Sequence, residues 1–127
     1  MALQFDEPEL ESLIENVCRP AAEAAGLALA TALDVARAGL IDDIMRIELR
    51  RARIVLVELT HSNRGAYWEG GFAEGLSKPV IYLCRRDVWE AEKTHFDTEH
   101  LHTVTWEPNN WNEAFERLRA SMQNSIA

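Results

Sequence analysis

The chain has 127 residues, the length of one ordinary domain, and its 47% hydrophobic and 27% charged residues place it in the globular class. Thirteen basic against twenty-one acidic residues give a formal net charge of −8, which excludes a protein that binds nucleic acid or anionic membrane through its overall charge. No apolar run reaches membrane-spanning length and no signal peptide opens the sequence. We therefore expect a single cytoplasmic domain over residues 1–127, with its two cysteines reduced.

The first quarter of the chain predicts a strand followed by a helix. Leu3–Phe5 is a brief apolar run, and Pro8–Ala25 carries apolar residues at helical spacing. Asp6 is placed to cap this helix and Gly26 to end it. Because a proline removes a hydrogen bond inside a helix, we expect a kink or a restart at Pro20.

The second quarter predicts another strand and helix before the strongest strand of the chain. Leu27–Leu33 is read as a strand, although an alanine-rich one. Asp34–Gly39 is read as a loop and Ile41–Arg51 as a helix with an apolar stripe. Four consecutive apolar residues, Ile54–Val57, are typical of a strand buried on both faces, and this strand runs into Glu58–Thr60.

The second half continues the alternation of strands and helices. Its polar loop covers residues 61–65, and a loop with a helical turn near Val88 is expected over Arg85–Leu101. The expected helices are Ala66–Leu76 and Asn112–Ile126, and the expected strands are Pro79–Cys84 and His102–Trp106.

Strands that alternate with helices predict a parallel sheet covered on both faces. We expect an α/β, flavodoxin-like (Rossmann-like) three-layer sandwich with a five-stranded parallel sheet of order 2-1-3-4-5. Folds of this kind bind ligands beyond the carboxyl ends of the strands, here between strands 1 and 3. The loops after Phe5, Leu33, Thr60 and Cys84 lie at that edge.

The segment after the strongest strand carries the residues that most resemble a site. Glu69 precedes Gly70 and Gly71, and Tyr67 and Trp68 flank it with aromatic surface. Glycines inside a helix cost about 1 kcal/mol each and are tolerated where a backbone or a ligand approaches closely. Two interpretations stay open. Either this is a carboxylate among aromatic rings that grips a sugar and a base, or Glu69 is a carboxylate in the first turn of a helix, Trp68 and Phe72 are core contacts at i, i+4 spacing, and the glycines pack against the sheet.

Residues 52–82, ARIVLVELTHSNRGAYWEGGFAEGLSKPVIY, resemble the nucleoside 2-deoxyribosyltransferase-like superfamily, and most closely its TIR-like, predicted nucleotide-binding branch. The shared pattern is a buried strand that ends in acidic-Leu-Thr, a loop containing Asn, an aromatic-Glu-x-Gly-x-Ala helix and a Gly-Lys-Pro-Val-Ile strand. Ser77 replaces the usual glycine of that last element. The segments 38–43 and 94–97 also resemble that branch.

The resemblance implies cleavage or transfer of an N-glycosidic bond of a nucleoside or nucleotide, without a metal or cofactor. Glu69 would be the nucleophile of a retaining mechanism with a covalent glycosyl intermediate, completed by transfer to a base or by hydrolysis. The expected substrate-binding residues are Phe5, Asp6, Asp34, Thr60, Asn63, Gly65, Tyr67 and Asp97. The alternative is a non-catalytic nucleotide-binding or self-associating TIR-like module.

Two positions depart from the transferase pattern. Asn63 stands where an acidic residue is usual, and an amide is no general acid at neutral pH. Glu58 stands where an aspartate is usual. These departures leave hydrolysis and ligand binding without turnover open beside transfer.

The remaining features have competing interpretations. The histidines and acids of residues 95–102 lack an established metal-ligand spacing, and a flap that points Phe96 and Asp97 toward the pocket is the preferred reading. The arginines of residues 46–53 suit subunit contacts as well as phosphate. Family members commonly complete the pocket with a neighbouring subunit, so we expect a homodimer or a higher homo-oligomer.

Overall fold

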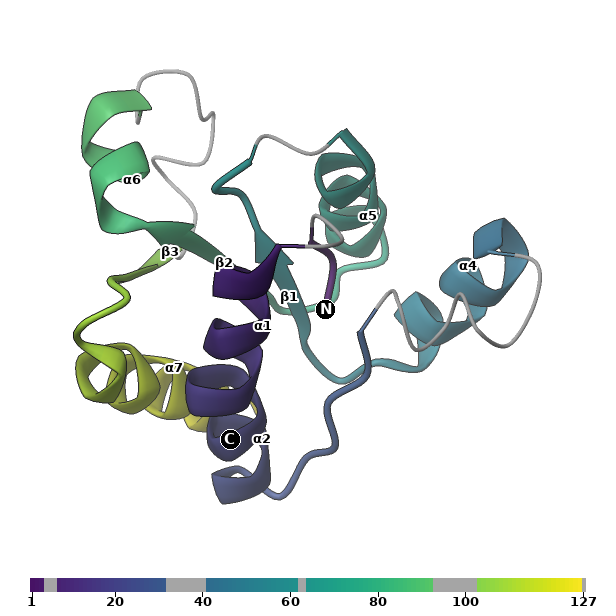
Figure 1. The fold of residues 1–127 in the computed structure, drawn as a ribbon. Coiled ribbons are helices and arrows are strands. Elements are labelled where there is room, and N and C mark those ends of the chain that lie inside the picture. Colours follow the sequence, from purple (N-terminus) through teal and green to yellow (C-terminus); the bar gives the residue numbers. More distant parts are fainter. Residues whose placement is uncertain (4–6, 32–40, 62–63, 93–102, 127) are drawn as a thin grey trace.

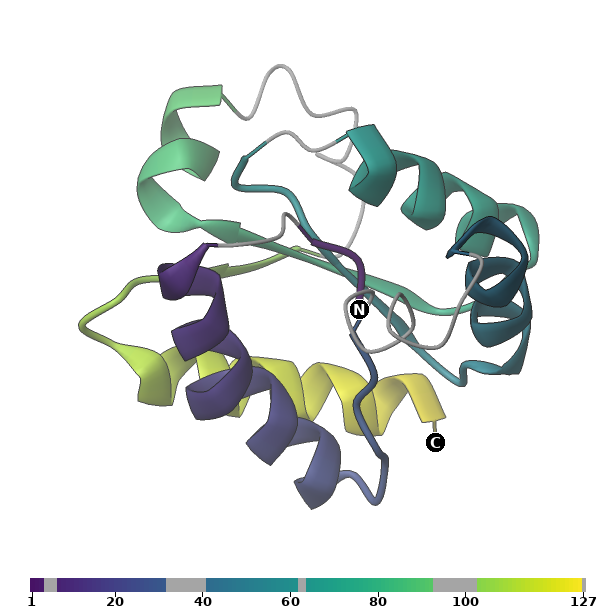
Figure 2. The same ribbon diagram turned by 45° about the vertical axis from the view of Figure 1, so that its right-hand side comes forward.

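The computed structural model describes residues 1–3, 7–31, 41–61, 64–92 and 103–126, and these form three layers with a parallel sheet in the middle (Figures 1 and 2). The strands are β1 (Val55–Glu58), β2 (Val80–Arg85) and β3 (Thr103–Trp106), in the order β1-β2-β3. Val57 pairs with Tyr82 and Leu83 with Val104. All carboxyl ends therefore lie at one edge of the sheet.

Helices cover both faces of this sheet. One face packs on a continuous N-terminal helical segment and on the closing helix; these are α1 (Pro8–Leu13), η1 (Ile14–Cys18), α2 (Arg19–Ala24) and α7 (Trp111–Ile126). The other face carries α5 (Arg64–Gly75), with α4 (Ile41–Arg51) and α6 (Arg86–Glu92) at its sides (Figure 2). Since side chains alternate along a strand, Leu56 points to the first face, and Val55 and Val57 point to the second.

The expectation of a five-stranded sheet is wrong: the sheet of the described residues has three strands. Of the first expected strand, Leu3–Phe5, only Leu3 lies in the described parts, and it belongs to no strand; the residue before it, Ala2, forms one parallel bridge with Val57. Of the second expected strand, residues 27–31 are described and form no strand, and residues 32 and 33 lie outside the described parts. Alternating alanines bring little side-chain surface to a ladder, which is the physical reason that this segment pairs poorly.

The expected disturbance at Pro20 is confirmed and takes the form of a π-helical segment, η1, immediately before it. A proline has no N–H and its ring crowds the carbonyl one turn earlier, so a locally wider helical turn accommodates it. The helix ends at Gly26, as expected, with φ +76° and with the Leu27 N–H bonded to the Ala22 carbonyl at 2.8 Å. The expectation that Asp6 caps the helix is wrong as to position: the N-cap residue is Glu7, whose side chain makes no capping hydrogen bond, and Asp6 itself lies outside the described residues.

The remaining elements follow the expected boundaries within one or two residues, with one addition. Where a loop with a single helical turn was expected, Arg86–Glu92 form α6, because Val88 and Trp89 pack against the core of the second face. No helix in the described ranges combines the length and apolar character that crossing a membrane requires.

Candidate functional site

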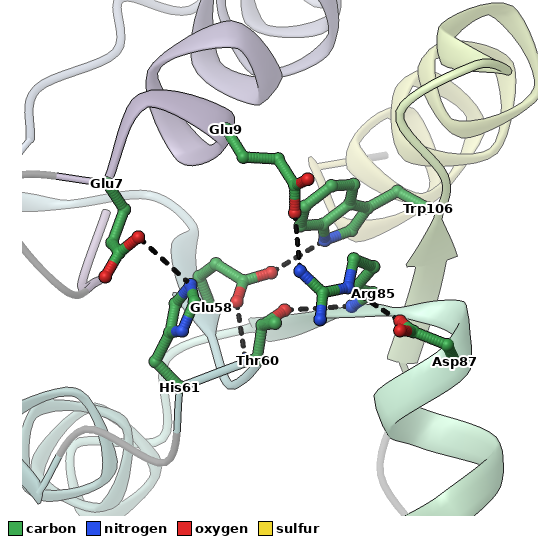
Figure 3. Close-up of polar contacts among 8 residues, drawn as sticks. All are labelled: Glu7, Glu9, Glu58, Thr60, His61, Arg85, Asp87 and Trp106. Carbon is green, nitrogen blue, oxygen red and sulfur yellow. Dashed lines mark hydrogen bonds and ion pairs between the residues drawn. The ribbon is translucent and has the colours of Figure 1, made fainter.

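A buried carboxylate marks the carboxyl edge of the sheet. Glu58, the last residue of β1, is only 2% exposed. Its Oε1 accepts a hydrogen bond from the Thr60 backbone N–H at 2.5 Å, and its Oε2 accepts one from the Trp106 indole Nε1–H at 2.7 Å (Figure 3). Burial raises the pKa of Glu58 to about 7, and the hydrogen bonds from Thr60 and Trp106 oppose that rise. Glu58 thus joins the ends of β1 and β3.

Thr60 and Arg85 extend this network to the end of β2. The Thr60 side-chain Oγ1 accepts a hydrogen bond from the Arg85 backbone N–H at 2.9 Å. The Arg85 guanidinium donates to Glu9 Oε1 at 2.7 Å and to Asp87 Oδ1 at 2.6 Å, and these bonds hold the pKa of Arg85 above its ordinary value. Because Glu9 belongs to α1, the start of α1 is tied to the ends of the strands (Figure 3).

The charges of this edge are largely paired with one another. His61 Nε2 lies 3.9 Å from Glu7 Oε2, and Arg86 contacts Glu107 at 3.0 Å and Glu113 at 3.2 Å. A groove of about 600 Å³ runs between α1, α6 and the residues after β3. Its lining includes Arg85 and Arg86 together with their carboxylate partners Glu9, Asp87 and Glu107. Because each arginine already faces carboxylates, the groove is poorly suited to a phosphate.

Glu69 has a different environment. It lies in the middle of α5, is partly buried, and forms no hydrogen bond or ion pair within the described parts of the chain. Loss of solvation raises the pKa of the Glu69 carboxyl, and the positive charge of the chain's α-amino group opposes the rise. Helical spacing puts Glu69 beside the sheet-facing row of Ala66, Gly70 and Ala73.

The neighbours of Glu69 on α5 serve packing. A Cβ at Gly70 would lie 3.2 Å from Val57 Cγ2, so this glycine allows the helix to approach β1, whereas a Cβ at Gly71 would meet nothing within 4 Å. Trp68 is 48% exposed and stacks on Phe72, with their ring centroids 5.4 Å apart. The close approach at Gly70 confirms the packing interpretation for that glycine.

Trp68 is also part of the contact between α5 and α4. The Arg46 guanidinium lies over the Trp68 ring at 5.6 Å, and that of Arg50 lies over the Phe72 ring at 5.9 Å. The two aromatic rings of α5 therefore face α4. Tyr67 is 36% exposed on the same helix, and the described contacts do not bring it to Glu69.

The structure places three of the nine expected site residues in described surroundings, namely Thr60 in the network and Glu69 and Tyr67 on α5. Gly65 belongs to the first turn of α5. The other expected residues lie outside the described ranges; they are Phe5, Asp6, Asp34, Asn63 and Asp97. The flap read at Phe96 lies outside them too.

The sequence did not single out Arg85, Glu9 or Trp106 as members of the edge network. A signal for part of it was present, since an acid directly after four apolar strand residues must find donors or raise its pKa. One partner of Glu58, Thr60, is two residues away, whereas the other, Trp106, lies 48 residues further along the chain and could not be identified by spacing. Among the residues with described positions, no three His, Cys, Asp or Glu side chains are grouped to hold a metal ion.

Comparisons with known proteins found no matching family model, no matching curated protein and no matching solved structure.

Proposed function

We propose that this protein cleaves or transfers the N-glycosidic bond of a nucleoside or nucleotide, with the Glu69 carboxylate as the nucleophile. The observation that carries the proposal is the state of this carboxylate, which is partly buried and without a hydrogen-bond or salt-bridge partner among the described residues. The carboxylates around the strand ends, those of Glu58, Glu9 and Asp87, are each held by donors.

A carboxylate that water solvates weakly is a stronger nucleophile and stabilises a nearby cation more effectively. The transition state of glycosyl transfer has oxocarbenium character, so Glu69 would act on it by charge as well as by bond formation. The resemblance of the Glu69 segment to the deoxyribosyltransferase-like superfamily supports the same assignment.

The reaction has two balanced steps. A Glu69 oxygen forms a bond to the anomeric carbon while the bond from that carbon to the base nitrogen breaks, and the base leaves with the electron pair and takes up a proton. Water or a second base then attacks the anomeric carbon of the glycosyl ester and gives up a proton to the solvent, which offsets the proton that the first base took up, and the ester bond breaks to restore the Glu69 carboxylate. Water gives hydrolysis and a base gives transfer.

The test is to incubate the protein with a panel of nucleosides, nucleotides and NAD and to measure the release of free base by chromatography. Glu69→Gln should lower turnover by at least about 10³-fold, because an amide is no nucleophile here. Glu74→Gln, on the exposed part of the same helix, is the matched control and should keep it. A 2-fluoro-substituted substrate should leave a covalent sugar on the peptide that contains Glu69. Turnover that survives Glu69→Gln, or no base release by the wild type from any member of the panel, refutes the proposal.

A second candidate, a self-associating module, is favoured by one observation. Trp68, Tyr67 and Ile47 are the large apolar side chains that stand out as exposed among the described residues, and they lie on α5 and α4. Exposed aromatic surface of this kind is typical of subunit interfaces. Light scattering should then report a dimer or larger species that Trp68→Glu converts to a monomer. A wild-type monomer at micromolar concentration contradicts this candidate.

A further inference from the structure

His61 lies at the carboxyl edge of the sheet, where the chain leaves β1 on its way to α5. The backbone just before it is fixed to β2. The Leu59 N–H donates to the Leu83 carbonyl at 2.8 Å, and Thr60 Oγ1 accepts a hydrogen bond from the Arg85 N–H at 2.9 Å. The residue that carries this imidazole therefore follows directly on a firmly held part of the chain.

The His61 side chain contacts the start of α1. Its Nε2 lies 3.9 Å from Glu7 Oε2, and the two side chains are 28% and 37% exposed (Figure 3). Glu7 is the residue that directly precedes α1. A carboxylate in contact with an imidazole orients the ring, and the partial exposure leaves the ring accessible to a ligand.

Glu69 borders the same side of β1 as His61. Gly70, the next residue of α5, packs closely on Val57, and Val57 forms the bridge to the N-terminal segment of the chain. Glu69 thus lies beside the start of that segment, and His61 contacts the residue at which α1 begins. Val57 and His61 are four residues apart, which is at most about 14 Å along an extended chain. A sugar held at Glu69 could therefore direct its base toward His61.

Among the described residues of this edge, His61 combines exposure with the ability to pass a proton near neutral pH. The Glu58 carboxyl is 2% exposed and is held by two hydrogen-bond donors, so a ligand cannot reach it. The carboxylates of Glu9 and Asp87 each accept a hydrogen bond from a guanidinium. Asn63, at the position where the resembling family carries an acid, is no general acid.

We propose that His61 is the general acid for the leaving base, and that the substrates are neutral purine nucleosides or nucleotides. The inference rests on the proposed function of Glu69. As the bond from the anomeric carbon to the base nitrogen breaks, its electron pair goes to the base, and the protonated imidazole donates a ring N–H proton to the purine N7. The neutral imidazole, in place of the solvent, then takes a proton from the water or second base that attacks the glycosyl ester, which restores its protonated form.

The experiment compares two substrates that differ in their need for a proton. They are the purine member of the panel that the wild type turns over fastest and its 7-methyl derivative, such as guanosine and 7-methylguanosine. The unmethylated base leaves as an anion unless it is protonated, whereas the methylated base already carries a positive charge and leaves as a neutral molecule.

His61→Gln should lower kcat/KM for the unmethylated substrate by at least about 10²-fold, which is the usual contribution of a general acid. It should change kcat/KM for the methylated substrate by less than about threefold, because no proton is needed there. Turnover of the methylated substrate also shows that the variant is folded. Asn109→Ala, at an exposed position after β3 on the same edge, is the control and should keep both activities.

The outcomes separate this inference from the assignment of Glu69. Glu69→Gln should abolish turnover of both substrates. If it does and His61→Gln slows both substrates equally or slows neither, the role of His61 is refuted and that of Glu69 stands. A wild type that releases base from no neutral purine substrate also overturns the inference, since His61 then has no proton to give. Turnover that survives Glu69→Gln refutes the proposed function, and the role of His61 with it.

Discussion

Replacing Glu58 by glutamine tests whether its burial at the end of β1 controls the pH dependence of stability. The pKa of Glu58 rises from an ordinary value of 4.5 to about 7 in the fold. A carboxyl with a raised pKa in the folded state stabilises the fold while it is protonated, and this stabilisation is lost as the pH rises from about 4.5 to 7. At about 1.4 kcal/mol per pH unit, the titration of Glu58 should lower the free energy of unfolding by roughly 2–3 kcal/mol between pH 5 and pH 8.

Glu58→Gln removes the titration but keeps the shape of the side chain. One of the two donors, Thr60 N–H or Trp106 Nε1–H, would face an amide NH₂ group, so we expect a cost of about 1–3 kcal/mol at pH 5. At pH 8 the wild type also carries the cost of a buried charge, so the two proteins should become nearly equal in stability.

The assay is unfolding in urea at pH 5, 6, 7 and 8, monitored by tryptophan fluorescence. The prediction is tested by the difference in free energy of unfolding between wild type and variant, because the contributions of other titrating groups cancel in this difference. Glu90→Gln, on the exposed side of α6, is the control and should parallel the wild type. If the curves for Glu58→Gln and wild type are parallel from pH 5 to pH 8, Glu58 does not titrate as the buried environment requires.

Three further substitutions have defined outcomes in the same unfolding assay. Ser77 has φ 59° at the end of α5, so Ser77→Gly should stabilise the protein by about 1 kcal/mol; no gain contradicts the left-handed conformation. Gly71→Ala should stabilise by up to about 1 kcal/mol and Gly70→Ala should destabilise by about as much, because a Cβ at Gly70 would lie 3.2 Å from a buried Val57 methyl group; equal effects refute the close approach. Trp106→Phe should cost about 1–3 kcal/mol and raise the pKa of Glu58 further, because it removes an indole donor; an unchanged pH profile would contradict that.

Local patterns predicted the helices and the central strands of this chain well. Pro8 and Gly26 mark a helix by their fixed and left-handed backbone preferences, and both mark its boundaries in the structure. The apolar run of Ile54–Val57 correctly predicted a strand buried on both faces. These features depend on neighbours in sequence, which is why the sequence alone is sufficient for them.

The number of strands could not be predicted in the same way, because strand pairing is decided by partners distant in sequence. The alanine-rich segment after Gly26 has the period of a strand, yet residues 27–31 form none. Ala2 reaches Val57 through one bridge only. Alternation of apolar residues with a period of two predicts on which face of a sheet each side chain would lie. It does not predict how strongly contacts between side chains of neighbouring strands stabilise the pairing.

In the candidate site too, features set by neighbours in sequence were predicted and contacts with distant parts of the chain were not. A helix that carries Glu69 after the central strand was predicted from sequence, but Glu69 was expected near the start of that helix and lies in the middle of α5, partly buried. The sequence left two interpretations of Trp68 open, a ring beside a ligand or an i, i+4 contact with Phe72, and the structure shows the contact with Phe72, together with Arg46 of α4 over the Trp68 ring. Consecutive side chains of an α-helix point about 100° apart. Trp68 and Glu69 are neighbours in sequence and therefore lie on different sides of α5.

The buried network gives a physical reason why the loop after β1 can position α5. Glu58 binds the Thr60 N–H, and Thr60 in turn accepts a hydrogen bond from the backbone of Arg85, so the chain leaving β1 is fixed to β2 before it reaches α5. Arg85 also holds Glu9 of α1, which couples the first helix to the same edge. Since buried polar groups favour the arrangement that satisfies them all, loss of Glu58 should disturb the start of α5 more than its packed middle at Gly70.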